Sequence, residues 1–203
     1  MIALLLAAAI AVAPSDSAAL AETAIDFANA WKIDDAERTA RRAYETAIVC
    51  DDRIGLARSL EAWSIATRLR GRAEEAMALA QESLIIADDA DGRARANNAI
   101  GRVYADLLED REEARSAFET ALAIPVSDRR IFVRASLNLG NLALGERDLR
   151  AARKAFLQAS EVATAIDDPE GRVAAAHNIG LTYSFQNDPN GALEWLVRAA
   201  DLD

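Results

Sequence analysis

The stretch Asn178-Ile179-Gly180-Leu181-Thr182-Tyr183 decides the fold, together with Ala192, Leu196 and Ala199, which follow it at helical spacing. Residues about one helical turn apart share a face of a helix, so the three later residues predict a second helix. Glycine inside a helix costs about 1 kcal/mol relative to alanine. Gly180 is therefore expected where two helices approach closely, and the stretch predicts a helical hairpin.

The same pattern recurs toward the amino terminus with a nearly constant period. Glycines of the predicted first helices stand at Gly101, Gly140 and Gly180, separated by 39 and 40 residues by subtraction. Small residues of the second helices are separated by 40, 38, 38 and 40 residues: Ala36, Ala76, Ala114, Ala152 and Ala192. Self-similarity at a fixed period is the signature of a repeat architecture. The sequence thus predicts an all-α protein of about five helical hairpins.

Aspartates mark the predicted helix starts after each hairpin, at Asp51-Asp52, Asp88-Asp89, Asp128 and Asp167-Asp168. Aspartate is a favoured N-cap and complements the positive end of a helix. The acidic pairs would also suit calcium, but they lack the alternating ligands of an EF-hand loop, so capping is preferred. Within the hairpins, turns are expected near residues 32–34, 70–72, 109–111, 145–148 and 186–189. Gly71, Gly145 and Asn187-Asp188-Pro189 mark three of them.

The pattern resembles a tetratricopeptide repeat. It is strong in the last three hairpins, around Gly101, Gly140 and Gly180, and moderate in the first two; the third carries one extra residue in its turn before Ala114. The first two hairpins are degenerate, with Trp63 and Ser64 where leucine and glycine would be usual. The resemblance covers about residues 18–203 and implies a right-handed α-solenoid. Its period of 38–40 residues, longer than the usual roughly 34, resembles arrays in large bacterial signalling proteins.

The first 21 residues are predicted to be a signal peptide or an apolar N-terminal helix, and residues 22–203 the repeat domain. Residues 1–13 form an uncharged apolar run, too short for the roughly 20 residues that span a bilayer. Ala19-Leu20-Ala21 is an acceptable cleavage site, although no basic residue follows Met1. Cleavage before Glu22 predicts export to the periplasm, and the alternative is a cytoplasmic chain.

Composition excludes several functions. The formal charge of −10 and the pI of about 4.7 disfavour nucleic-acid binding, because the phosphate backbone is itself negative. His177 is the only histidine and Cys50 the only cysteine, so no metal site or cofactor is expected. No motif of an enzyme is present, and the tryptophans are expected to pack in the core or between repeats: Trp31, Trp63 and Trp195.

The expected function is a non-catalytic scaffold for a protein or peptide. The resemblance implies that the first helices line a concave groove, where arginines and amides gather although the chain is acidic. Guanidinium groups hold carboxylates and amides hold an extended backbone, which favours an acidic or C-terminal peptide. The predicted binding residues are Arg58, Arg68, Asn98, Arg102, Arg134, Asn138, Asn141 and His177.

Two alternatives to this function remain. These residues could only bridge neighbouring helices, or the chain could be the sensory or regulatory region of a histidine kinase, diguanylate cyclase or transcriptional regulator.

Overall fold

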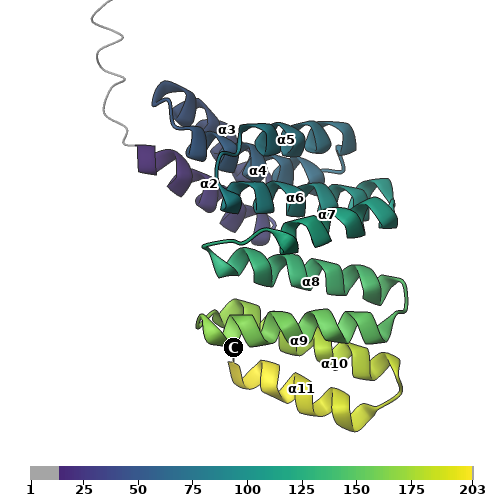
Figure 1. Cartoon of the computed structure of the whole chain (residues 1–203). Helices are drawn as coiled ribbons and strands as arrows, with labels where there is room; N and C mark the ends of the chain where they lie inside the picture. The colour runs from purple at the N-terminus through teal and green to yellow at the C-terminus, as the bar shows by residue number, and fades with distance from the viewer. Residues whose placement is uncertain (1–13, 203) are drawn as a thin grey trace, which may run out of the picture. The chain divides into compact units, whose positions relative to one another are not determined.

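The computed structural model describes residues 14–202, which form ten α-helices and one short π-helix and contain no strand (Figure 1). The predicted all-α fold is confirmed. In chain order the elements are α2 (Pro14–Asn29), α3 (Ile33–Val49), α4 (Arg53–Leu69), α5 (Ala73–Ile86), α6 (Ala90–Val103), the π-helix η2 (Tyr104–Leu108), α7 (Arg111–Ala123), α8 (Arg129–Gly145), α9 (Leu149–Ala165), α10 (Pro169–Phe185) and α11 (Pro189–Leu202).

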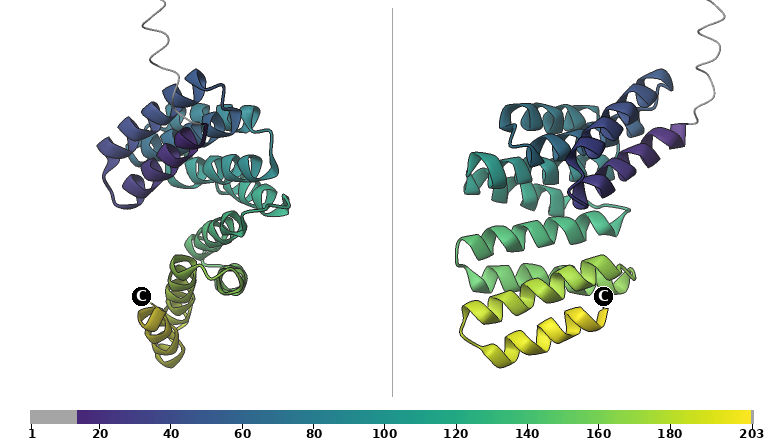
Figure 2. Two further views of the ribbon diagram at one scale, coloured as in Figure 1. Left: turned by 90° about the vertical axis from the view of Figure 1, so that its left-hand side faces the viewer. Right: turned by 180° about the vertical axis from the view of Figure 1, so that it is seen from behind.

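The chain divides into two compact units, Met1–Glu109 and Asp110–Asp203. In the first unit, α2 packs on α3 and α4 on α5, and the first helices α2, α4 and α6 also contact one another in sequence. In the second unit, α8 packs on α9 and α10 on α11, which lie side by side and antiparallel (Figure 2), and α8 contacts α10. Successive helices therefore alternate between first and second members of hairpins, the order of an α-solenoid.

The connections within hairpins lie where the sequence predicts them, with one exception. Residues 70–72, 109–110, 146–148 and 186–188 connect helices, as expected. The first connection spans residues 30–32 rather than 32–34, because α2 ends at Asn29. Trp31 in this connection adopts a positive φ of 58°, a conformation that commonly ends a helix. Glycine usually occupies such a position, and its absence here left no sequence signal for the helix end.

Aspartate capping is confirmed. The side chain of Asp52 accepts a hydrogen bond from the Gly55 N–H at 3.0 Å. Asp89, Asp168 and Asp188 accept the same bond from the glycine three residues later. A Cβ on Gly55 would stand 1.9 Å from the Ser17 hydroxyl and 2.3 Å from the Asp52 carboxylate, so the packing of Ser17 on this cap favours glycine at position 55. No group of ligating side chains that could hold a metal occurs among the described residues.

The extra residue of the third hairpin lies in its first helix, not in the turn as predicted. It is absorbed by η2, where the chain changes from α-helix to π-helix before Glu109 adopts a positive φ of 54°. Short π-helices of this kind usually accommodate a single inserted residue and are frequent at functional sites. The insertion therefore changes the direction of the side chains in η2, which include Asp106.

Close contacts at Gly140 and Gly180 are confirmed. A Cβ on Gly140 would stand 2.4 Å from Cε1 of Phe156, and one on Gly180 would stand 3.0 Å from Cγ of Leu196. Among the tryptophans, Trp63 and Trp195 pack against core clusters as expected. Trp31 does not, and 75% of its surface is exposed, because it lies in a turn rather than on a helix face.

The apolar segment of residues 1–13 lies outside the described residues. The predicted cleavage site lies inside α2, where Ala21 is buried and contributes to a core cluster. Ser17, also buried, donates a hydrogen bond to the capping carboxylate of Asp52. No helix within residues 14–202 is both long enough and apolar enough to cross a bilayer.

Candidate functional site

A cluster of two arginines and one aspartate joins α4 to η2 in the first unit. Arg68, only 7% exposed, donates to Asp106 at 2.5 Å. Arg102, which is half exposed, reaches the same carboxylate oxygen at 3.3 Å. The Nε of Arg68 is buried and has no hydrogen-bond partner among the described residues. One carboxylate thus serves two guanidinium groups, and the cluster keeps an excess positive charge.

Burial and the two neighbouring charges together set the pKa of Arg68. Burial, together with the charge on Arg102, lowers the pKa of Arg68 to about 10, and the nearby carboxylate of Asp106 opposes this effect. Arg68 therefore remains charged at neutral pH, although desolvation disfavours the charge. A second carboxylate at the exposed side of Arg102 would be stabilised by the same field.

The remaining predicted residues of the first unit lie on the same first helices, α4 and α6. Arg58 of α4 pairs with Glu22 of α2, and Asn98 on α6 is half-buried. Sequence reasoning missed Glu22 as a partner. The available signal was its position 36 residues before Arg58, about one repeat earlier. Arg58 and Arg68 each bridge neighbouring first helices, which places both on the layer that those helices form.

In the second unit the predicted residues lie on α8 and α10. Asn141 accepts a hydrogen bond from the amide of Asn178 at 3.2 Å, which bridges the two helices. Asn138 is half-buried. Arg134 and His177 are exposed, and Arg134 makes no ion pair with any residue from 14 to 202. Each unit thus places its predicted residues on its first helices, while a single site that joins the two units remains a prediction.

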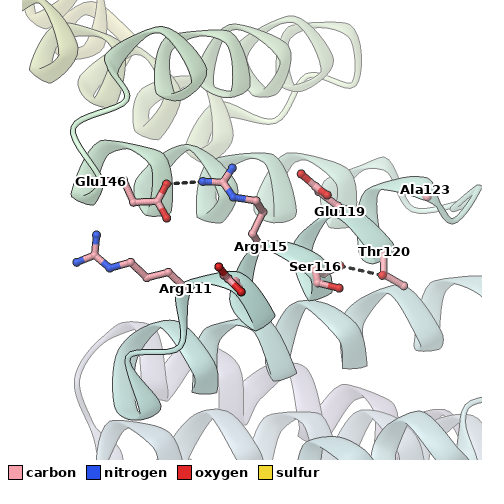
Figure 3. A pocket seen from close by; sticks show the side chains of 8 residues that line it. Arg111, Arg115, Ser116, Glu119, Thr120, Ala123 and Glu146 are labelled. Atoms are coloured by element: carbon pink, nitrogen blue, oxygen red, sulfur yellow. Dashed lines mark hydrogen bonds and ion pairs between the residues drawn. The ribbon is translucent and has the colours of Figure 1, made fainter.

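The second helices carry a different arrangement, which sequence reasoning missed. In three joints, the residue after the small alanine of a second helix contacts the residue that follows the end of the next first helix. We call this pair the joint pair. In the second unit Arg115 pairs with Glu146, beside a shallow hollow of about 490 Å³ (Figure 3). The equivalent pairs are Glu37–Arg70 and Arg153–Gln186.

These joint pairs are structural contacts with different chemistry in each joint. Glu37 receives Arg70 at 2.6 Å and Arg72 at 2.8 Å. Burial raises the pKa of Glu37, but hydrogen bonds from Arg72, Arg41 and Arg70 outweigh that effect and the pKa is lowered. Arg153 lies 3.8 Å over the ring of Tyr183 and donates to Gln186 at 2.5 Å. The second-helix arginines thus hold joints together and cannot serve as inert references for binding.

The alternating hairpins, their glycine contacts and their capping aspartates define a helical repeat protein. Models of the tetratricopeptide repeat match residues 94–125 and 132–203, together about half of the chain. The chain belongs to the tetratricopeptide-repeat family. The matches begin at the third hairpin, which agrees with the degenerate pattern of the first two.

Solved structures of similar fold include other repeat proteins. BtubC (BKLC) from P. vanneervenii has a TM-score of 0.65 at 20% identity, over 93% of this chain and 82% of that one. YrrB, described as a TPR protein with an unusual peptide-binding site, has a TM-score of 0.52 at 20% identity, over 91% and 84%. The apo form of RapI has a TM-score of 0.65 at 16% identity, over 90% and 52%. Among curated proteins, none matches the chain.

Proposed function

We propose that this chain is a non-catalytic scaffold that binds the carboxylate of an acidic or C-terminal peptide on its first helices. The single observation that carries the proposal is the Arg68–Arg102–Asp106 cluster, in which two guanidiniums share one carboxylate. The tetratricopeptide family and its peptide-binding neighbour YrrB support a role in protein interaction.

Asp106 takes the place of a ligand carboxylate beside Arg68 in the unbound protein. Its carboxylate satisfies Arg68 when no ligand is bound, while Arg102 keeps exposed donors that a ligand carboxylate can use. Arginine suits this task because its planar donors match a carboxylate in two parallel bonds. In the second unit, the exposed side chains of Arg134 and Asn141 offer separate contacts to a peptide backbone or to acidic residues.

The experiment is a binding screen with peptides of random sequence and a free C-terminus, followed by titration of the recovered peptides. We expect acidic or C-terminal carboxylates to be enriched and binding to weaken with salt. Arg102→Ala should cost about 1.5–3 kcal/mol of affinity, the value of a hydrogen bond to a charged group. Arg134→Ala and Asn138→Ala should weaken binding less, with helical content unchanged.

Asp106→Asn provides the opposite test, because it removes the internal competitor for Arg68. We expect it to tighten carboxylate binding while it lowers stability. Arg42→Ala is the matched control, since Arg42 is exposed on the second helix α3 and makes no ion pair within the described residues. Retrieval of neutral peptides only, or equal losses for Arg42→Ala and Arg102→Ala, would refute the proposal.

We also propose that the apolar amino terminus directs export. The buried positions of Ser17 and Ala21 add a structural consequence. Cleavage before Glu22 would remove the first half of α2, including the Ser17 hydroxyl that bonds to Asp52. A mass measurement on protein from its native host tests this. An intact Met1 on cytoplasmic material would reject export.

A further inference from the structure

Hollows recur at equivalent positions on the second helices, and their shape is a product of the repeat. The hollow beside the Arg115–Glu146 joint pair follows α7 (Figure 3). A hollow of about 580 Å³ follows α9, and its lining residues on that helix stand 38 positions, by subtraction, after those of the α7 hollow. Another, of about 590 Å³, follows α3. Because the shape recurs, any special function of one hollow must come from its side chains.

The α9 hollow differs from the other two in charge and in apolar lining. The described residues that line it include three cations and one anion, namely Arg150, Arg153, Lys154 and Glu161. The α7 hollow is lined by two arginines and three glutamates, and the α3 hollow by four arginines and three acidic residues. Leu157, which is 43% exposed, takes the position that Glu119 has on α7 and Arg41 on α3. The α9 hollow is thus cationic and partly apolar within an acidic chain.

The cations of the α9 hollow have no carboxylate partner in the described part of the chain. Arg150 and Lys154 are exposed and form no ion pair with any residue from 14 to 202. Arg153 contacts neutral groups, because it donates to Thr182 at 3.0 Å and to Gln186 at 2.5 Å. In the α7 hollow the equivalent arginine, Arg115, is paired with a glutamate. The charges of the α9 hollow are therefore available to carboxylates of a ligand.

The start of α9 departs from that of the preceding second helices. The first turns of α3, α5 and α7 each contain two acidic residues: Asp34 and Asp35, Glu74 and Glu75, Glu112 and Glu113. Acidic residues there complement the positive end of a helix. The first turn of α9 contains none, and Arg150 stands where α7 has Glu112. Since this arginine opposes the helix dipole, helix stability does not explain it, whereas a bound anion would.

Three side chains of α9 follow one face of the helix. Arg150, Lys154 and Leu157 are four and three residues apart, so they extend over about 10 Å at 1.5 Å per residue. Half-buried Leu149 lines the same hollow, and the aliphatic stems of arginine and lysine add apolar surface. We call these four residues the α9 face. A helix that presents anchors at matching intervals of three and four residues can lie along it.

We propose that the α9 face binds an acidic amphipathic helix of a partner protein. An apolar side chain of that helix would contact Leu149 and Leu157, and its carboxylates would pair with Arg150 and Lys154. A helix fits better than an anionic membrane, because a bilayer would also face the acidic remainder of a chain of charge −10. The α9 face lies on a second helix, so this proposal does not depend on carboxylate binding by the first helices.

The test uses a synthetic helix of about 18 residues, or about five turns, with leucines and glutamates on one face. Its ends are acetylated and amidated, so it has no terminal carboxylate. A matched peptide carries glutamine in place of each glutamate. We expect the full chain to bind the glutamate peptide at least about tenfold more tightly than the glutamine peptide, because only the former offers charge-assisted bonds. Fluorescence anisotropy measures both affinities.

Substitutions on the α9 face locate the binding. Arg150→Glu and Lys154→Glu should each weaken binding of the glutamate peptide by at least about tenfold, because each reverses an attractive charge. Arg150→Glu also restores the acidic first turn of the other second helices, so helical content should be unchanged. Leu157→Ser should weaken binding about fivefold through lost apolar contact. Arg111→Glu is the matched control, since it reverses an exposed arginine of the α7 hollow, and it should bind as the unaltered chain does.

A charge exchange gives the sharper result. A peptide with lysine in place of each glutamate should bind the Arg150→Glu, Lys154→Glu double variant at least about tenfold more tightly than the unaltered chain. Equal affinity for the glutamate and glutamine peptides overturns the proposal, as do equal losses for Arg111→Glu and Arg150→Glu. Loss of binding in Arg102→Ala, with the α9 variants unaffected, would place the peptide on the first helices instead. Binding to vesicles of phosphatidylserine and phosphatidylcholine without binding to the peptide would overturn it in favour of a membrane.

Discussion

The two units make the same contact between the helices of a hairpin, but with side chains of different size. In the second unit, Gly140 faces Phe156, and the ring fills the space that a side chain on the glycine would occupy. In the first unit the equivalent pair is Ser64 and Ala80, both buried. The Ser64 hydroxyl donates to the Ala76 carbonyl at 2.7 Å, so the buried polar group is satisfied.

The difference shows that the same hairpin contact accepts either a glycine against a large side chain or small residues on both helices. Gly180 with Leu196 follows the second unit, and Ala24 with Ala40 follows the first. Gly140 and Gly180, each against a large side chain, both lie within the residues that the family models match. The first two hairpins keep the geometry with small residues on both sides.

The largest expected effect comes from overfilling the second unit. Gly140→Leu should cost about 3 kcal/mol or more, because Phe156 is fully buried and cannot move aside. Gly180→Leu should cost about 1–3 kcal/mol, since Leu196 is half-buried and can shift. Denaturant unfolding measures both losses.

Two further variants sharpen this comparison. Gly145→Ala is the control, because nothing lies within 4 Å of a Cβ there, and it should not destabilise. Gly140→Ser combined with Phe156→Ala recreates the pair of the first unit, and the double variant should lose less stability than the sum of the two single losses, because the smaller partner removes the overlap at position 140. If the two losses simply add, the two positions do not share one space.

Most of the fold was predictable because its signals are local or periodic. The capping aspartates, the contact glycines and four of the five turns follow from residues close in sequence. Trp31 was misplaced because an aromatic at helical spacing says nothing about where a helix ends. The π-helix was missed because an inserted residue has the same sequence signature in a turn as in a helix.

The candidate site was less predictable because its partners are distant in sequence. Arg58 and Arg68 could be identified as first-helix residues from the repeat pattern. Their partners Glu22 and Asp106 lie 36 and 38 residues away, and Asp106 depends on the direction that the π-helix gives it. The joint pairs were missed for a similar reason, since one partner ends a helix and its position depends on the turn.

An intermediate effect is expected at the joint of the first unit. Glu37→Gln should cost about 1–2 kcal/mol at pH 7, because it weakens charge-assisted bonds from partly exposed arginines. The folded pKa of Glu37 is lowered, so its contribution is present above its unfolded pKa and is lost as pH falls through the folded value. The difference between Glu37→Gln and the unaltered chain should therefore shrink below about pH 4.5.

The matching variant in the second unit should behave differently. Gln186→Ala removes the amide partner of Arg153 at a joint pair without a carboxylate. Its cost should be about 0.5–1.5 kcal/mol, as for an ordinary hydrogen bond, and should not change across the same pH range. Unfolding of both variants from pH 3 to 7 checks the contrast. Parallel pH profiles would show that Glu37 does not control the acid response of its joint.

The smallest expected effect concerns the sign of charge at a joint. Arg115 and Glu146 occupy the positions that Glu37 and Arg70 occupy in the first unit, with the charges exchanged. Both side chains remain partly exposed, so their coupling should be about 0.5–1 kcal/mol. Arg115→Glu and Glu146→Arg should each destabilise by placing like charges together. The double variant reproduces the arrangement of the first unit and should return most of the loss, as measured by a double-mutant cycle in denaturant.

The same cycle in high salt should give a smaller coupling, because exposed charges are screened. A coupling of zero at low salt would mean that the backbone at the helix end, and not the paired charges, holds this joint together.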